Sequence, residues 1–211
     1  MAGTHPAGRE ERPENSLATL RKLNARRKWA QVDDEISAQP SILLRPLGVW
    51  DEEQARQAHV ELARDAFDFL VELRLGEDWS VFLRRLDSLR RGVDLPEGRV
   101  PATFLVAEAE RQVVGRVSIR HELNAYLAEV GGHIGYAVRP GFRRRGYATE
   151  ILRQSLTVAS TIGLDRVLVT CDADNVGSAK VIENCGGVLE NVVSGREWSV
   201  DKCRYWVETG S

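Results

Sequence analysis

The sequence has few cysteines and histidines, which excludes several kinds of site. Its 211 residues include three cysteines, Cys171, Cys185 and Cys203, and no CxxC pair. Three scattered cysteines are too few for a disulfide framework, and the four dispersed histidines show no zinc-type spacing. We therefore expect no metal site and a reduced, cytoplasmic setting, with Cys171 and Cys185 acting as small buried apolar residues.

Long apolar runs and an excess of positive charge are also missing. No apolar run approaches the ~20 residues of a membrane span. The N-terminus lacks the apolar core of a signal peptide, and its acidic residues argue against a transit peptide. The formal net charge of −2 argues against a protein that mainly coats nucleic acid. We expect neither a membrane nor a nucleic acid as partner.

The composition that remains is that of an ordinary globular protein, with 43% hydrophobic and 28% charged residues. Residues 1–40 are predicted to be an N-terminal extension, partly disordered, with a short helix carrying Leu17, Leu20 and Leu23. This extension is either a solvated arm or an arm that docks on a partner subunit. Residues 41–211 are predicted to form a single domain.

Hydrophobic periodicity and turn residues predict an order of β, α, α, β, β, β, α, β, α, β, β. The expected strands are 41–46, 103–107, 113–120, 133–138, 166–171, 188–193 and 203–207. The expected helices are 52 to about 76, 78–92, 147–163 and 175–184. This order predicts an α/β fold of the α+β type. It has a mixed, mostly antiparallel sheet of six to seven strands, one parallel β-α-β crossover and helices on both faces.

A basic turn at residues 143–148 separates a strand from a helix. Gly146 allows close backbone approach and positive φ, and the amides that open the following helix have no intrahelical partner. Such a helix N-terminus is an anion site, with phosphate as the usual ligand. Arg143, Arg144 and Arg145 add charges that can pair with phosphate oxygens. The opposing interpretation is a solvated arginine run; the strand, glycine and helix around it favour phosphate binding.

This turn is neither a dinucleotide fingerprint nor a Walker loop, because no GxGxxG and no Gly-Lys-Ser/Thr occurs. The run from Val138 to Ala148 instead resembles the acyl-CoA loop of the GNAT superfamily, in which Arg143, Gly146 and Ala148 fill the three defined positions. Asn175 and Ser178 resemble the helix that borders the cofactor in that family. Together with the element order, the resemblance covers about four-fifths of the chain. Within the superfamily, the chain looks most like a bacterial group of predicted acetyltransferases without an assigned substrate.

The resemblance implies an N-acetyltransferase with acetyl-CoA as co-substrate and a primary amine, on a small molecule or a peptide, as acceptor. The amine would attack the thioester directly. The implied cofactor-binding residues are Ala137, Val138, Arg143, Arg144, Arg145, Gly146, Tyr147, Ala148, Thr149, Asn175 and Ser178. A homodimer formed through the C-terminal strands is also implied.

The catalytic residues are less defined. Many relatives carry a tyrosine as general acid at the position that Ile182 fills here, so Tyr126, Tyr136 or water would have to substitute. Many also carry a base at the positions of Gly132 and Ile134. Glu129, His121 and His133 are the candidates for the base, although strand alternation places His133 on the opposite face unless a bulge redirects it.

The missing acid and base leave a second hypothesis open, in which the chain is a non-catalytic acyl-CoA-binding or sensor module. Release of free thiol from acetyl-CoA in the presence of amines discriminates between an enzyme and a sensor.

Overall fold

The computed structural model describes residues 40–71, 73–195 and 200–210, and the findings below refer to those residues. The predicted N-terminal extension, including its short helix, lies outside them apart from Pro40.

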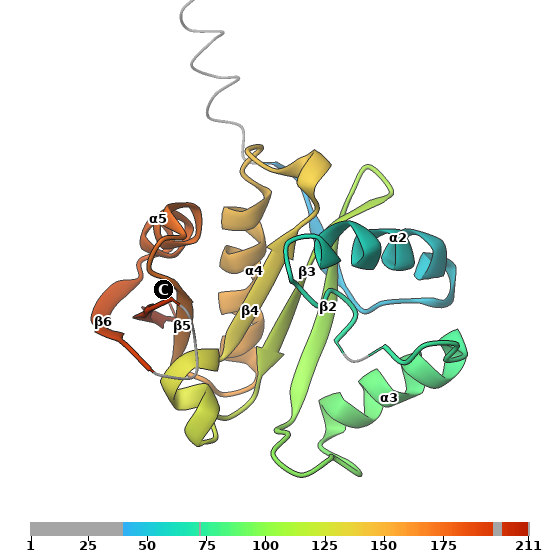
Figure 1. Cartoon of the computed structure of the whole chain (residues 1–211), viewed down its shortest axis with the longest axis horizontal. Coiled ribbons are helices and arrows are strands. Elements are labelled where there is room, and N and C mark those ends of the chain that lie inside the picture. The colour runs from blue at the N-terminus through green and yellow to red at the C-terminus, as the bar shows by residue number, and fades with distance from the viewer. Residues whose placement is uncertain (1–39, 72, 196–199, 211) are drawn as a thin grey trace, which may run out of the picture. The chain divides into compact units, whose positions relative to one another are not determined.

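Seven strands form one sheet with the order β1-β2-β3-β4-β5-β7-β6 (Figure 1). Their bounds are β1 (Leu43–Arg45), β2 (Ala102–Ala109), β3 (Gln112–Arg120), β4 (Ile134–Val138), β5 (Arg166–Asp172), β6 (Val188–Val193) and β7 (Lys202–Glu208). Neighbouring strands are antiparallel except for β4 and β5. The predicted mixed sheet with one parallel crossover is therefore confirmed.

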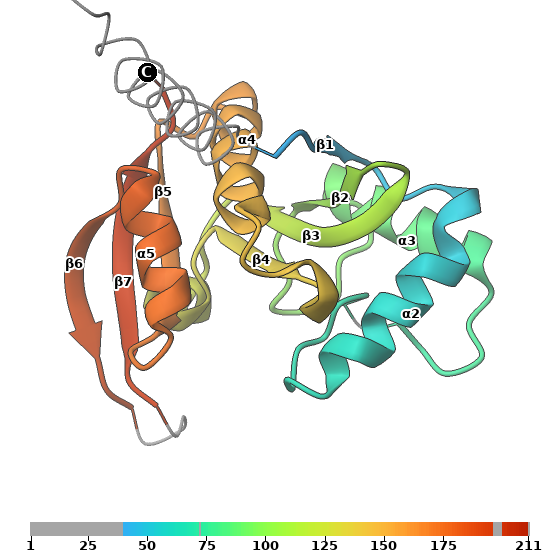
Figure 2. The same ribbon diagram turned by 90° about the horizontal axis from the view of Figure 1, so that it is seen from above.

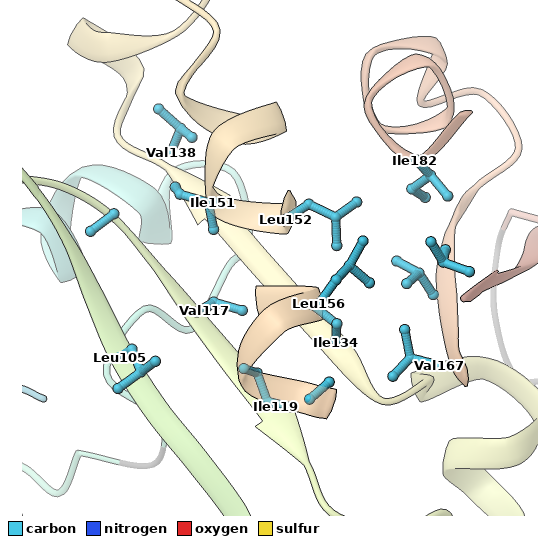
Figure 3. Close-up of a cluster of buried hydrophobic side chains, with 14 of the residues drawn as sticks. Leu105, Val117, Ile119, Ile134, Val138, Ile151, Leu152, Leu156, Val167 and Ile182 are labelled. Carbon is cyan, nitrogen blue, oxygen red and sulfur yellow. The ribbon is translucent and has the colours of Figure 1, made fainter. Parts of the chain in front are cut away.

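Four helices pack on this sheet: α2 (Glu52–Ala63), α3 (Trp79–Arg91), α4 (Tyr147–Thr161) and α5 (Val176–Asn184). The helices α4 and α5 cover one face, where Ile151, Leu152 and Ile182 pack against Val117 and Val167 (Figure 3). The helices α2 and α3 cover the other face, over a second core that includes Phe69, Phe82 and Phe104. The predicted placement of helices on both faces is confirmed.

The two parallel strands β4 and β5 touch at one end only. Ile134 and Val169 are their single paired position, whereas β5 pairs with β7 at seven successive positions from Arg166 to Asp172. Beyond Ile134 the two strands part, and Figure 2 shows β5, β7 and β6 standing at an angle to β2, β3 and β4. The separation leaves backbone groups of β4 without a strand partner on the β5 side.

Local signals set the bounds of α3 as the sequence predicts. The Asp78 carboxylate accepts hydrogen bonds from the amides of Ser80 (2.8 Å) and Val81 (3.4 Å), which caps the helix N-terminus. Gly92 ends the helix in the left-handed conformation, with φ 69°.

The helix predicted to run from residue 52 to about 76 is wrong in its length, because α2 ends at Ala63. The amide of Phe67 bonds to the carbonyl of Leu62 (3.1 Å), and Ala66 takes a positive φ of 54°, which turns the chain out of the helix. Phe69 and Leu70 are fully buried, as their hydrophobicity predicts, but they lie in an irregular segment. In the sequence, these buried apolar residues have the spacing of a helix that continues beyond Ala63.

The segment before β4, predicted to be irregular at 121–129, contains a π-helical turn at Leu127–Gly131. Gly132 follows with φ 62° and leads into β4. None of the helices in the described ranges has the length and apolar character of a membrane span.

Candidate active site

A cleft of about 770 Å³ opens where β4 and β5 part. It is lined by residues from the end of α2 and the segment after it, the end of β4, the loop into α4, and the first turns of α4 and α5. The lining residues are Leu62, Asp65, Ala66, Phe67, Tyr136, Ala137, Val138, Phe142, Arg143, Arg144, Gly146, Tyr147, Ala148, Thr149, Asp172, Asn175, Gly177, Ser178 and Val181. Ten of the eleven predicted cofactor-binding residues lie on this surface, and Arg145 is the exception.

The loop between β4 and α4 turns its backbone toward the cleft through two left-handed residues. Arg144 has a φ of 62°, and Gly146 has a φ of 79° immediately before α4. A Cβ at Gly146 would lie 3.2 Å from the Pro40 Cδ atom, so glycine is favoured there by both conformation and space.

The N-terminus of α4 faces the cleft. Its first intrahelical bond runs from the amide of Glu150 to the carbonyl of Gly146 (3.2 Å), so the amides of Tyr147, Ala148 and Thr149 have no intrahelical partner. The helix dipole adds partial positive charge at these amides. This wall of the cleft is suited to an anion such as phosphate.

The three arginines of the turn differ in what they contact. Arg143 pairs with Asp65 across the cleft and donates from Nε to the carbonyl of Val138 (3.1 Å). Arg144 lines the cleft and is exposed. Arg145 lies over the ring of Phe142 at 5.7 Å and does not line the cleft. Arg143 and Arg144 are therefore the side-chain charges available to a bound phosphate.

Nearby Arg139 is a structural residue. Its buried guanidinium donates to both carboxylate oxygens of Glu61 (2.9 and 2.7 Å) and to the carbonyl of Val113 (3.0 Å). The ion pair holds the pKa of Glu61 below its usual range. These bonds fix the end of β4 against α2 and so hold one side of the cleft in place.

The opposite wall is the start of α5. Asn175 caps this helix, since its side-chain oxygen accepts a hydrogen bond from the amide of Ser178 (3.0 Å). The Asn175 amide group is thereby oriented at the rim of the cleft. Ile182, at the position of the missing tyrosine, is fully buried in the core.

Tyr136 reaches the cleft from the middle of β4. Its hydroxyl oxygen is buried and has no hydrogen-bond partner within the described chain. Burial raises the pKa of this phenol above its ordinary value, and the Ser178 side chain, which lies near the hydroxyl but outside hydrogen-bond geometry, opposes the effect. A buried hydroxyl without a partner is costly, so a bound ligand is the natural partner for it.

The four predicted catalytic residues do not line the cleft. Glu129 is exposed in the π-helical turn, and Tyr126, just before it, is 66% exposed. His121 follows β3 and lies within hydrogen-bonding distance of the Thr103 hydroxyl (2.9 Å).

His133 is buried beside β5. Its Nδ1 accepts a hydrogen bond from the amide of Leu168 (2.9 Å), and its own amide donates to the carbonyl of Leu168 (2.7 Å). Burial, with a contribution from Arg120, lowers the pKa of His133 to about 4. The imidazole is therefore neutral at pH 7 with Nδ1 engaged, which favours a role in joining β4 to β5.

Sequence reasoning did not identify the contribution of the segment after α2. Asp65, Ala66 and Phe67 form one edge of the cleft. The helical spacing of Ala66, Phe69 and Leu70 after Leu62 predicted a continued helix and concealed the turn that brings this segment to the cleft.

Comparisons with known proteins agree with this geometry. The family model for the acetyltransferase (GNAT) domain matches residues 41–188. No match was found among curated proteins. RimJ from Mycobacterium smegmatis, solved in complex with CoA-disulfide, superimposes with a TM-score of 0.59 at 20% identity, over 80% of this chain and 82% of that one.

Two further solved structures share the fold. The microcin C7 self-immunity acetyltransferase MccE, in complex with acetyl-CoA and AMP, has a TM-score of 0.57 at 18% identity, over 79% of this chain and 92% of that one. The ribosomal-protein-S5-alanine acetyltransferase from Vibrio fischeri has a TM-score of 0.57 at 16% identity, over 80% of this chain and 93% of that one. With the family match over most of the domain, the chain is an acyltransferase that belongs to the GNAT acetyltransferases.

Proposed function

We propose that the protein transfers an acetyl group from acetyl-CoA to a primary amine by direct attack of the amine on the thioester. The observation that carries this proposal is the α4 N-terminus, which opens on a cleft between two parting parallel strands. Structures of the same fold contain acetyl-CoA or CoA-disulfide, which supports the choice of co-substrate.

In this proposal the amides that open α4 and the side chains of Arg143 and Arg144 bind the CoA pyrophosphate, with Arg145 adding longer-range charge. The pantetheine arm extends along β4, where backbone groups on the β5 side, including the amide of Val138, have no strand partner and can bind it in the manner of an added strand. Asn175 and Ser178 border the arm from α5. These contacts would hold the thioester near the middle of β4.

The reaction then needs little covalent chemistry from the protein. The amine nitrogen attacks the thioester carbonyl carbon, the carbon–sulfur bond breaks, and CoA leaves as a thiolate that takes up a proton. Fixing the two reactants together supplies much of the rate enhancement. A β4 amide near Val138 would stabilise the developing oxyanion.

We propose Tyr136 as the proton donor to the leaving thiolate, in place of the tyrosine that Ile182 replaces. Its buried hydroxyl makes no hydrogen bond to the described residues, and Tyr136 lines the cleft. The phenol is protonated at neutral pH, as a donor requires, while burial raises its pKa and makes it a weaker acid before the ligand binds. Tyr126 is the competing candidate for this role.

Glu129 and His121 remain the candidate bases for the acceptor proton, with His133 disfavoured by its bond to Leu168. Substituting Glu129→Gln and His121→Gln one at a time tests them. A side-chain base should shift the acidic limb of the kcat/KM profile when it is removed, whereas proton transfer to water leaves that limb in place.

The central experiment combines calorimetry with acetyl-CoA and an assay of free thiol released across a panel of primary amines. The proposal expects saturable binding of acetyl-CoA and amine-dependent thiol release, with the N-acetylated amine detected by mass spectrometry. Lack of acetyl-CoA binding would overturn it. Binding without acetylation of any amine would instead leave a binding module.

The homodimer is also a proposal. Strand β6 is a sheet edge with three exposed apolar side chains, Val188, Leu189 and Val192. Sedimentation equilibrium of the whole chain tests it, since a mass that stays at that of one chain at high concentration contradicts a dimer.

A further inference from the structure

Strand β3 carries a polar row on the face of the sheet that α2 and α3 cover. Arg116, Ser118 and Arg120 alternate along the strand, and Arg116 contacts Phe104 of the core on that face. Arg116 is 5% exposed and Ser118 is 7% exposed. A core-facing row of this kind normally carries apolar residues, so these polar residues need an explanation.

Arg116 is a buried cation held by neutral groups. Its Nη1 donates to the carbonyl of Gly135 (3.2 Å) and its Nη2 to the carbonyl of Asp68 (2.8 Å), while its Nε has no partner among the described residues. The guanidinium lies 4.5 Å from the centre of the Phe67 ring. Burial lowers the pKa of Arg116 to about 9, which still leaves the group charged at neutral pH.

Arg120 approaches the same part of β4. Its Nη1 donates to the carbonyls of Gly131 (2.9 Å) and Gly132 (3.2 Å). The same atom lies 3.5 Å from the position that a Cβ of Gly135 would occupy. Gly135 and Arg120 are both partly exposed.

Neither arginine has a carboxylate within ion-pair distance in the described part of the chain. The charge of Asp68 raises the pKa of Arg116, and the Asp68 carboxylate is 52% exposed and lies 3.6 Å from the His59 Nδ1 atom. Buried charges in proteins are normally paired, because an unpaired one carries the full cost of desolvation. Two neighbouring cations that also repel each other are more costly still.

This positive region lies beside the cleft, on the other face of the sheet. Ala137 pairs with Arg116 in the β3–β4 register and lines the cleft, as does Phe67, which stacks on Arg116. The amides of α4 and the Tyr136 side chain belong to the opposite face, toward α4 and α5. The lining of the cleft includes Tyr136 from one face and Ala137 and Phe67 from the other, so an acceptor at Gly135 would lie next to residues of the cleft.

We propose that Arg116 and Arg120 bind an anionic group of the acceptor beside Gly135, so that the acceptor is an amine that also bears a carboxylate or a phosphate. This inference rests on the proposed acetyl transfer and specifies its substrate class. Guanidinium groups suit both anions, since they offer paired N–H donors to two oxygens. Two cations nearby also disfavour an ammonium ion and so help to supply the neutral amine that attack requires.

Matched amine pairs test the inference on the unmodified protein. Each pair differs by the anionic group: β-alanine and propylamine, phenylalanine and phenethylamine, phosphoethanolamine and ethanolamine, and a dipeptide with a free or an amidated C-terminus. We expect kcat/KM to be at least about tenfold higher for the anionic member of one or more pairs, as for a hydrogen-bonded charge. The carboxylate and phosphate pairs distinguish the two kinds of anion.

Two variants locate the preference in the structure. Arg116→Met should remove most of it while acetyl-CoA affinity stays within about twofold. Gly135→Val keeps both arginines and fills the space beside Arg120, so it should also remove most of the preference. It replaces Arg116→Met in the test if that variant does not fold. Arg166→Met is the control, because Arg166 also lies 4.5 Å from an aromatic ring, that of Trp206, but on β5.

The outcomes separate this inference from the function on which it rests. Absence of acetyl-CoA binding overturns the proposed function. If acetyl-CoA binds and at least one amine is acetylated, equal rates for charged and neutral members of every pair, or no acetylation of any anionic amine, overturn the inference alone. A preference that survives unchanged in both Arg116→Met and Gly135→Val also overturns it.

Discussion

Arg143 and Asp65 form an ion pair across the cleft, which joins the loop before α4 to the segment after α2. Both side chains are 45% exposed. The pair engages the arginine that we assign to phosphate, so the free protein holds this side chain in place with an acid that a bound phosphate would have to displace.

Asp65→Asn should therefore tighten acetyl-CoA binding. A pair this exposed is worth at most ~1 kcal/mol, so the gain should not exceed about fivefold. Arg143→Met should weaken binding, and calorimetry at low salt measures both changes. Asp87→Asn, which removes an exposed acid of α3 paired with Arg90, is the control. Weaker binding by Asp65→Asn would show that the pair supports the site instead of competing with its ligand.

Gly146→Ala should weaken acetyl-CoA binding by about tenfold. The left-handed conformation costs a residue with a Cβ roughly 1–2 kcal/mol, and the added methyl would press on Pro40. The loop would relax and move its amides away from the phosphate. Gly141→Ala is a matched control in the same loop, because Gly141 has no positive φ and a Cβ there meets nothing within 4 Å. Equal affinities for acetyl-CoA in these two variants would contradict the assignment of the loop.

Tyr136→Phe should lower kcat by about 100-fold, within the range of general-acid catalysis, and leave the Kd for acetyl-CoA nearly unchanged. Removing the hydroxyl also removes a buried polar atom without a partner, so the variant should unfold at the same temperature as the wild type or a higher one. Tyr126→Phe tests the competing donor with the same chemical change. A loss of kcat in Tyr126→Phe alone would move the role to Tyr126.

The buried His133 should make stability depend on pH. Its pKa is about 4 in the folded protein, compared with about 6.5 in an unfolded chain. Between these values the unfolded chain binds the extra proton, so stability is lost as the pH falls from about 6.5 toward 4. The free energy of unfolding should drop by about 2 kcal/mol between pH 7 and pH 5 through this group.

Urea unfolding of the wild type and His133→Gln at the two pH values measures the effect. In His133→Gln, the difference in the free energy of unfolding between pH 7 and pH 5 should be mostly lost. His121→Gln should keep most of it, since burial also lowers the pKa of His121 but this residue is only partly buried. An unchanged pH dependence in His133→Gln would assign the effect to other groups.

The fold and the phosphate loop could be predicted from sequence because their signals are local. Arg143, Gly146 and Ala148 lie within six residues of one another, and the helix that follows has a clear apolar stripe. The role of His133 could not be predicted, since it depends on a bond to Leu168, 35 residues away, and on the positive φ of Gly132. Period-2 alternation gives the face of a side chain but not the atom that it will meet.

The positive region of β3 was missed for a related reason. In sequence, Arg116 and Arg120 look like the solvent-facing positions of an alternating strand. Only the return of the chain after α2, which stacks Phe67 on Arg116, turns that row into buried charge. The same return closes one edge of the cleft, so the error in the length of α2 and the missed arginines have one origin.

The single paired position between β4 and β5 has a mechanical consequence. The sheet consists of two parts, β1 to β4 and β5 to β7, which are joined at one end of β4 and β5. An extended ligand between β4 and β5 would take the place of a strand and bridge the two parts. Such a ligand would be a structural part of the protein as well as its reactant. Each turnover would then stiffen the molecule on loading and loosen it on release, and the protection of the β4 amides from hydrogen exchange would report which state is present.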